Sequence, residues 1–446
     1  MKQILWIALP IAGIGLLLIV FFAVVLGVPH FFLKSNHLRQ ILTSETNERF
    51  GTEGQWMPFE LKNWQLHSAG YDGTGDSRSV VETMRIENVQ IQLDWMALLR
   101  RSWKVTLIEV KHVSIEMRQP PDKAKPATTP RNMPSISPLA ALLPRDYQID
   151  RINFSNIDVT WRTKDSEYQV TDVVAELTPS ISNNWSASLK SGTFSPPSRS
   201  KWKLNSGRAI YQNNEVSLDR LEWFGEQAGL VTINGAIEIE PNLKAKLDFQ
   251  GKGVPASALL ESKWQSFVQG TINTRATATI DLKSVTISGE ASGNLIRLIG
   301  IPQLASLSIA TGIREWTELP LDTAWMEFKY ADEVLTIDKS IFESSQLCRL
   351  EGSVSIEDDN LSGTYQVGVR DPVVRKIPGA KLSVFSLEQG GFHWAQPPMQ
   401  LSGTMKAPKE DLSPRLKTAA LNVIQDRIEK GMQKGLDYLD GLFNAR

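Results

Sequence analysis

Residue types that commonly catalyse reactions or bind metals are few and scattered in this sequence. The five histidines have no spacing typical of metal ligands: His30, His37, His67, His112 and His393. The sequence contains no HExxH, GxSxG or Walker motif. The single cysteine, Cys348, excludes both an internal disulfide and a multi-cysteine metal site. The sequence therefore predicts no catalytic residue, no metal site and no cofactor.

Two further polar segments favour turns over ligand sites. Gly70, Gly73 and Gly75 lack the spacing of a dinucleotide-binding loop, and no helical pattern follows them. Asp358 and Asp359 lie between two alternating segments, where acidic residues commonly form hairpin turns. We therefore predict a turn at each place.

The dominant pattern is alternation of apolar and polar residues. Ile91 and Leu93, for example, alternate with Gln90 and Gln92, which is the two-residue period of a β-strand with one apolar face. Such a face is buried against a second sheet, under helices, by barrel closure, or inside a strongly curved trough with room for acyl chains. The residues that we predict to line such a trough are Ile91, Leu93, Val113, Ile115, Val231, Ile233, Leu247, Phe249, Leu350, Val354, Val367 and Val369.

The N-terminal segment differs from the rest of the chain. No charged residue lies between Ile4 and Val28, and about 25 helical residues cover roughly 37 Å, enough to cross a hydrocarbon core of about 30 Å. A cleaved signal peptide is the alternative, but its apolar core is shorter and ends in small residues, whereas Pro29 and Phe31 follow here. We predict a membrane anchor over residues 1–33, with flanking positive charges too evenly divided to orient it.

Several other segments are predicted to be helical. Residues 35–50 begin with a capping residue, share an apolar face and end before Gly51. Pro255 begins a short helix that extends to Val268. Residues 295–321 are apolar but irregular, and we predict a helical or looped cover on the sheet.

The chain ends in a predicted long amphipathic helix. It begins near Ser413-Pro414, and its apolar residues recur every three or four positions as far as Phe443, opposite a charged face. We expect it either to cap the sheet or to dock on a membrane or a partner protein.

An internal repeat relates two segments of the chain. Ala97–Val105 recurs 44 residues later as Ala141–Ile149. The correspondence continues through Ile108 and Ile152, Val110 and Phe154, Val113 and Ile157, Ile115 and Val159, and Met117 and Trp161. Repetition of one supersecondary unit favours a stacked, elongated array over a closed globule.

Composition excludes one class of partner and marks one linker. Charged residues make up 22% of the chain and the formal net charge is −1, so there is no basic surface for nucleic acid. Residues 119–138 contain six prolines, which predicts an exposed linker.

Several apolar patterns together resemble the AsmA-like proteins of Gram-negative envelopes. In the N-terminal half the resemblance rests on the anchor, the capped helix, and Ile91–Leu99 followed by Val105–Ile115. In the C-terminal half it rests on Leu304–Leu307, Leu319–Leu321, Phe328–Tyr330, Leu335–Ile337, Leu350–Val354 and Leu401–Gly403. The linker and the terminal helix are less typical of the family.

The resemblance implies a mainly β fold: one N-terminal transmembrane helix, an elongated, curved antiparallel sheet shaped as a groove, a few short helices and the C-terminal amphipathic helix. The predicted parts are the anchor 1–33, an AsmA-like helix and β unit 34–118, the linker 119–138, a main groove domain 139–407 and the terminal helix 408–446.

The resemblance also implies a function and a location. We expect a non-enzymatic protein, anchored once in the bacterial inner membrane, whose periplasmic body binds phospholipid in lipid transport or outer-membrane homeostasis. An envelope scaffold that assists outer-membrane protein assembly through a protein partner is the alternative. An anchored hydrolase is the least favoured reading, because no residue motif supports it.

Overall fold

The structure of the chain is a computed structural model. It describes residues 36–443 except for gaps at 63–64, 77–78, 95–101, 119–145, 164–165, 181–183, 198, 226–228, 239–243, 260–264, 282–283, 302–303, 306–307, 310–311 and 406. The predicted anchor, the proline-rich linker and the first part of each repeat copy lie outside the described residues, so these three stay predictions. Within the described residues, no helix is both long enough and apolar enough to cross a bilayer.

The described residues are mainly β, as predicted. Their strands are β1 Thr52–Trp56, β2 Phe59–Lys62, β3 Gln65–Gly75, β4 Val81–Leu93, β5 Ser102–Arg118, β6 Asp146–Ile149, β7 Ile152–Arg162, β8 Glu167–Pro179, β9 Trp185–Ser195, β10 Trp202–Gln212, β11 Glu215–Gly225, β12 Leu230–Glu238, β13 Lys244–Pro255, β14 Val268–Asp281, β15 Val285–Ile299, β16 Glu318–Leu321, β17 Thr323–Ala331, β18 Val334–Ser344, β19 Cys348–Glu357, β20 Asn360–Val369, β21 Leu387–Gln389, β22 Phe392–Trp394, β23 Met399–Gly403 and β24 Pro408–Glu410. The helices are α2 Asn36–Phe50, α4 Ala256–Leu259, α6 Asp371–Val374, α7 Ala380–Ser383 and α8 Leu412–Phe443, with 3₁₀ turns η2 Gln265–Phe267 and η3 Arg314–Thr317.

The chain forms two compact units. The first comprises residues 1–249 and 279–283, and the second comprises residues 250–278 and 284–446. Strands β13 and β14 therefore contribute residues to both units. The two units are described separately below.

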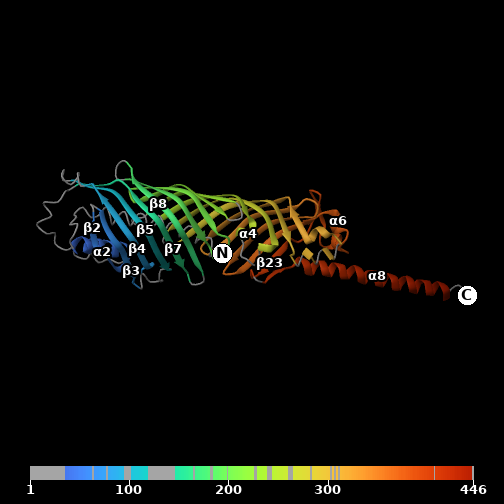
Figure 1. Cartoon of the computed structure of the whole chain (residues 1–446). Coiled ribbons are helices and arrows are strands. Elements are labelled where there is room, and N and C mark those ends of the chain that lie inside the picture. The colour runs from blue at the N-terminus through green and yellow to red at the C-terminus, as the bar shows by residue number, and fades with distance from the viewer. Residues whose placement is uncertain are drawn as a thin grey trace. The chain divides into compact units, whose positions relative to one another are not determined.

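The first unit is an ordered succession of paired strands. β1 and β2 both pair with β3, and the ladder continues through β4, β5, β7, β8, β9, β10 and β11 to β12. These pairs are antiparallel except where β5 pairs in parallel with β6 and β7. Figure 1 shows the strands side by side in blue through green.

The parallel pairing joins the two copies of the internal repeat residue by residue. Ile108 pairs with Ile152 and Val113 pairs with Ile157. The other matched positions pair in the same way: Trp103 with Tyr147, Val105 with Ile149, Val110 with Phe154, Ile115 with Val159, and Met117 with Trp161. The positions that match in the sequence repeat are therefore the positions that pair between β5 and β6–β7.

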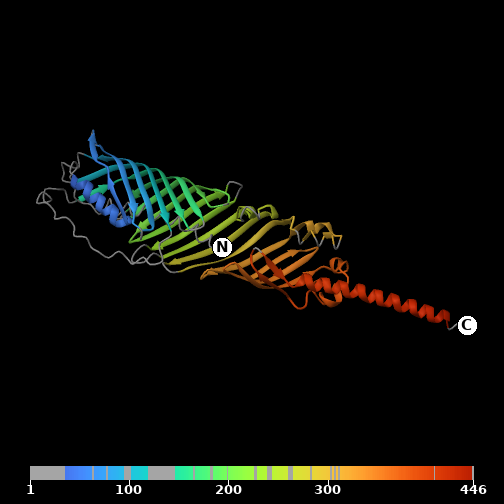
Figure 2. The same cartoon turned by 90° about the horizontal axis from the view of Figure 1, so that it is seen from below.

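Helix α2 confirms the prediction for residues 35–50 and packs at the β1 end of this unit (Figure 2). Gly51 follows it with φ +62°, the left-handed conformation that commonly ends a helix. The Asn47 side chain accepts a hydrogen bond from the Gly54 backbone N–H (3.0 Å) and donates one to the Gly54 carbonyl (3.1 Å). Trp56 Nε1 donates to Thr46 Oγ1 at 3.0 Å. Polar side chains of α2 thus form hydrogen bonds with backbone groups of β1, as the backbone of a neighbouring strand would.

In the second unit, β15 pairs with β16 at one end and with β17 at the other, and β17 to β20 form a meander. β20 then pairs with both β22 and β23. Two-residue hairpins connect several of these strands. In the predicted turn at Asp358 and Asp359, φ is +45° and +72°, a conformation that acidic and amide residues tolerate well. This turn prediction is confirmed.

Helices close the end of the second unit. Val373, Val374, Ala380 and Ala419 are buried in one apolar cluster with strand residues of β19 and β20. α8 therefore packs on its own unit at its start, as the capping prediction proposed, and continues past the strands (Figure 1). Beyond Ala419 several of its described apolar side chains are exposed: Leu421, Ile424, Ile428 and Met432.

Three local predictions are wrong in whole or in part. The glycines at 70, 73 and 75 form no turn but lie inside β3, where a Cβ on Gly73 would lie 2.4 Å from Tyr71 Oη. Gly73 leaves space for the Tyr71 ring, whose hydroxyl donates a hydrogen bond to Asn47 Oδ1 (2.6 Å), whereas Gly70 and Gly75 leave space for the carbonyls of Ile86 and Val81. The glycines are needed for close packing inside the strand, and in the sequence they resemble a turn.

The cover predicted over residues 295–321 is partly strand. Leu298 in β15 pairs with Leu319 in β16. The two-residue period is invisible there because Leu298 and Ile299 are both apolar. The helix predicted from Pro255 to Val268 is also wrong at its end, because β-branched Val268 begins β14.

Candidate functional site

Continuous apolar rows cross one side of the first unit's sheet. One row consists of Leu66, Ile91, Ile108, Ile152, Leu177, Ala187, Ala209 and Leu218. A neighbouring row consists of Val89, Val110, Phe154, Ala175, Leu189, Gly207, Leu221 and Ile233. Each member faces the next across a strand pair. We call the side that carries these rows, and its equivalent in the second unit, the apolar face.

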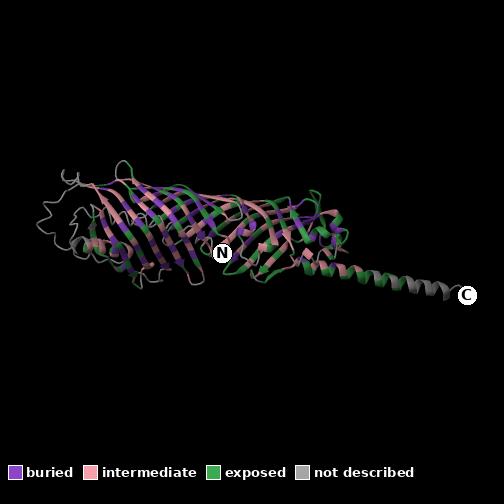
Figure 3. Ribbon diagram, in the orientation of Figure 1, coloured by how far each residue is buried: buried purple, intermediate pink, exposed green. Residues whose placement is uncertain are grey.

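The middle of this apolar face is filled by its own side chains. Val110 and Ile152 are 0% exposed and Phe154 is 1% exposed. Figure 3 shows buried residues alternating with half-buried and exposed ones along the strands. Strands β5, β7 and β8 therefore supply a packed apolar core to the first unit.

The eight predicted lipid-contact residues of the first unit all lie in strands. Four of them are buried: Val113, Ile115, Ile233 and Leu247. The other four are half-buried: Ile91, Leu93, Val231 and Phe249. The accessible positions thus lie on β4 and on β12 and β13, to either side of the packed middle.

Register brings some of these residues into contact distance. Ile91 faces Ile108, and Val113 faces Ile86 and Ile157. On β12, Val231 faces Trp223 of β11, two residues from the buried Ile233.

The four predicted residues of the second unit share β19 and β20. Leu350 faces Val367, and Val369 faces Cys348. Val354, Val367 and Val369 are buried, whereas Leu350 is half-buried. Further half-buried apolar side chains surround this cluster, among them Ile272, Leu335, Ile337, Phe342, Leu361 and Met399. The apolar face of the second unit is therefore more accessible than the packed middle of the first.

Charged pairs occupy the opposite side of the first unit's strands. Arg162 Nη2 lies 3.2 Å from Glu116 Oε1, and its Nε lies 3.1 Å from Glu167 Oε2. The hydrogen bond that Arg162 donates to Glu167, and then those that it donates to Glu116, raise the pKa of the Arg162 guanidinium. Lys190 Nζ lies 2.6 Å from Glu176 Oε2, and this hydrogen bond lowers the pKa of Glu176. The sheet thus has apolar residues on one side and ion pairs on the other.

Two of the histidines named in the sequence analysis have carboxylate partners, and the cysteine is buried. His112 Nε2 lies 3.0 Å from Asp158 Oδ2, and His393 Nε2 lies 3.2 Å from Asp371 Oδ1. Cys348 is buried, and desolvation raises the pKa of its thiol to about 12. Among the described residues, no group of three or more His, Cys, Asp or Glu is placed to hold a metal ion.

Two buried tryptophans were not singled out by the sequence: Trp223 on the apolar face of the first unit and Trp316 in η3, within the apolar cluster of the second. Trp223 is 5% exposed and Trp316 is 4% exposed, and neither indole Nε1 has an acceptor among the described residues. Trp223 follows Leu221 in an alternating segment, so alternation could have assigned its face. The missing acceptor is visible only in three dimensions.

Comparison with known proteins identifies a family. No curated protein matches the chain, and no solved structure matches it. The model of the AsmA family matches residues 1–340 of the 446, which include both Trp223 and Trp316. A mainly β chain with a long apolar face agrees with an envelope or lipid-transport role for such a protein. The chain therefore belongs to the AsmA family.

Proposed function

We propose that this protein binds phospholipid acyl chains on the accessible parts of its apolar face and supports lipid transport in the bacterial envelope. The observation that carries the proposal is the row of half-buried apolar residues in the second unit, around Phe342 and Leu350. Half-buried apolar side chains still expose area to water, and each acyl methylene buried against them contributes about 0.8 kcal/mol.

The remaining parts of the proposal follow from the anchor and the family. Residues 1–33 hold the chain once in the inner membrane, and the two described units lie in the periplasm. Lipid is bound and moved without covalent change, so the protein is not an enzyme. The lipid is a phospholipid, and nucleic acid is not a partner because the net charge is −1.

In-cell photocrosslinking of the full-length chain tests this function. Phe249 and Phe342 are half-buried phenylalanines of the apolar face, and p-benzoylphenylalanine replaces them with another aromatic residue. The matched controls are Lys246 on β13 and Lys339 on β18, which are exposed. We expect phospholipid adducts from Phe249 and Phe342 and none from the two lysine positions, as measured by mass spectrometry of the purified protein.

The most buried residues are unsuitable positions for this test. Ile233 is 1% exposed, so an aspartate there would place an unpaired charge in the core and unfold the unit. Loss of lipid in such a variant would report on folding. Half-buried positions keep folding and binding separate.

The packed middle of the first unit supports a second candidate, a scaffold for outer-membrane protein assembly. A face filled by its own side chains at Val110 and Ile152 leaves the strand edges as the surface for partners. This candidate predicts protein adducts at edge strands such as β2 and no lipid adduct at Phe249 or Phe342. That outcome would reject lipid binding.

A further inference from the structure

The indole N–H of Trp223 is a buried hydrogen-bond donor on the apolar face. Trp223 is 5% exposed, and its Nε1 has no acceptor among the described residues. Buried polar groups in folded proteins almost always have a partner, because leaving one without a hydrogen bond costs stability. Phenylalanine would supply the same apolar ring without that cost, so the donor at this position requires a reason.

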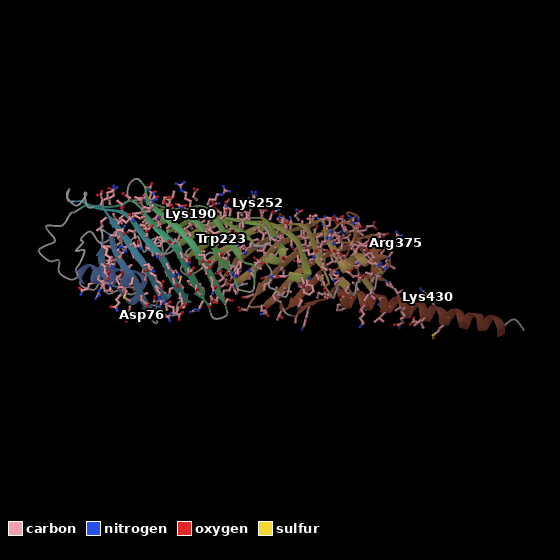
Figure 4. All side chains as sticks on the ribbon, viewed as in Figure 1. Asp76, Lys190, Trp223, Lys252, Arg375 and Lys430 are labelled. Carbon is pink, nitrogen blue, oxygen red and sulfur yellow. The ribbon has the colours of Figure 1, made fainter. Side chains whose placement is uncertain are left out.

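The surroundings of Trp223 are apolar. It faces Leu204 on one side and Val231 on the other, and the Phe194 ring meets it edge-on with centroids 6.1 Å apart. Figure 4 labels Trp223 within the strands of this unit. A charged acceptor such as a phosphate would be costly to bury here, so a neutral acceptor attached to an apolar group fits best.

The indole lies where packing gives way to accessibility. Leu204 and Leu221 on the β10–β11 side are buried. On the next strand, Val231 is half-buried, and Phe249 on β13 is half-buried as well. Accessible apolar side chains therefore begin on β12, the strand that pairs with β11 at Trp223, and continue on β13.

We infer that Trp223 Nε1–H binds the ester carbonyl of a diacyl phospholipid whose acyl chain lies along β12 and β13. The ester is a neutral acceptor that directly adjoins an acyl chain, so one ligand supplies both the apolar contact and the missing acceptor. The inference rests on the proposed lipid-binding function and adds a chemical preference to it: ester-linked lipid over ether-linked lipid. Dialkyl ether lipids have the same chains and headgroup but lack the carbonyl oxygen.

A competition experiment with the full-length chain tests this preference. The purified protein, delipidated in a non-ionic detergent, is incubated with equal amounts of diacyl- and dialkyl-phosphatidylethanolamine of the same chain length. Lipid recovered with the protein is quantified by mass spectrometry. We expect the diacyl lipid to be enriched between about two-fold and ten-fold, the range for one neutral hydrogen bond.

The variant Trp223→Phe removes the donor and keeps an aromatic ring. Its bound lipid is expected to be similar in total amount but with a diacyl to dialkyl ratio near one. The matched control is Trp56→Phe, because Trp56 is also buried in the first unit but its Nε1 bonds Thr46 Oγ1 at 3.0 Å. This control should keep the wild-type ratio.

A second measurement needs no substitution. Diacyl lipid labelled with carbon-13 at the ester carbonyl should show a carbonyl stretch at lower wavenumber when bound to the wild-type protein than when dispersed in an apolar solvent, because the carbonyl accepts a hydrogen bond. This readout holds even if Trp223→Phe fails to fold.

The possible failures are distinct. Wild-type protein that retains neither lipid overturns the proposed function, and the role of Trp223 with it. Wild-type protein that retains both lipids equally, or a Trp223→Phe variant that keeps the diacyl preference, overturns only the role of Trp223 and assigns its N–H to a bound water. An unshifted carbonyl stretch in the bound lipid has the same meaning.

Discussion

Gly207 lies in the middle of an apolar row, between Leu189 and Leu221. A Cβ at this position would lie 2.3 Å from Leu221 Cδ1 and 3.3 Å from Leu189 Cβ. We expect Gly207→Val to lower the free energy of unfolding by about 1–3 kcal/mol, the usual cost of overpacking a core. Urea unfolding followed by tryptophan fluorescence measures this change.

The control for this variant is Ser188→Val. Ser188 is exposed on β9 and faces Arg208, the residue next to Gly207. A valine there should change the unfolding free energy by less than about 0.5 kcal/mol. Equal effects of the two substitutions would show that the apolar row is not packed at Gly207.

The buried thiol of Cys348 gives a second residue-scale prediction. Because its pKa is raised to about 12, the folded chain holds it as an unreactive thiol at pH 8, whereas unfolding restores a pKa of about 8.5. We expect Ellman's reagent to react slowly with the native protein and rapidly in urea. A Ser353→Cys variant, at an exposed position of the same strand, should react rapidly in the native state.

The same shift gives an expected pH dependence. A thiol with a raised folded pKa stabilises the fold below the unfolded pKa, and this contribution is lost as pH rises from about 8.5 towards 12. Wild-type protein should therefore lose more stability over this interval than Cys348→Ala. An identical alkaline profile for both proteins would contradict the burial of this thiol.

At the scale of elements, the β5–β7 pair offers a direct test of register. Glu116 pairs with Thr160 across parallel strands, so cysteines at these two positions have Cα atoms within the range of about 4.4–6.8 Å that a disulfide needs. With Cys348 replaced by alanine, we expect Glu116→Cys/Thr160→Cys to form a disulfide on oxidation. Peptide mass spectrometry detects the crosslink.

The control pair shares one of these positions. Ser114 pairs with Asp158, so Ser114→Cys/Thr160→Cys places the two cysteines two residues out of register, beyond that range. A crosslink in the control but not in the test pair would indicate a register shifted by two residues.

The sequence showed the internal repeat, and the structure adds that its two copies pair in parallel. Each copy of the repeat preserves the same alternation, and a one-residue slip between the copies would turn the apolar residues of one copy to the opposite side. Helix α2 was predicted for a comparable reason, since its cap and stop signals are local. The 295–321 segment was predicted poorly because adjacent apolar residues, Leu298 and Ile299, interrupt the alternation at the end of β15 and β16 has only four residues.

The candidate site was predicted only in part. Alternation assigned twelve residues to an apolar face, and the structure buries or half-buries all of them. Alternation could not distinguish the buried Ile233 from the half-buried Val231, because their exposure depends on which other side chains cover each of them. The absence of an acceptor for Trp223 Nε1 likewise depends on which residues of other strands surround the indole, so the sequence could not show it.

At the scale of the whole molecule, the linker can be cut without cutting a described strand. Residues 119–145 connect β5 to β6, and β5 pairs with β7 along both strands. We expect a protease site inserted after Thr128 to give, after cleavage, two fragments that remain associated and unfold together. Size-exclusion chromatography and urea unfolding of the nicked protein test this.

A site inserted in the β10–β11 turn, after Asn213, is the comparison. That turn has two residues with φ +50° and +64°, so its strands are joined directly and an insertion disturbs the hairpin. Nicked protein with the linker cut that separates into free fragments would show that the parallel pairing alone does not hold the first unit together.

The parallel seam between β5 and β7 also has an evolutionary consequence. Two copies of one sequence segment pair in register. The second copy therefore offers its next neighbour the same strand edge that the first copy offers the second. Tandem duplication of such a segment lengthens a sheet without requiring a new interface, provided that each added copy brings a connection long enough to return to its start. Lineages of this family can therefore change the length of the apolar face in whole steps of one repeat.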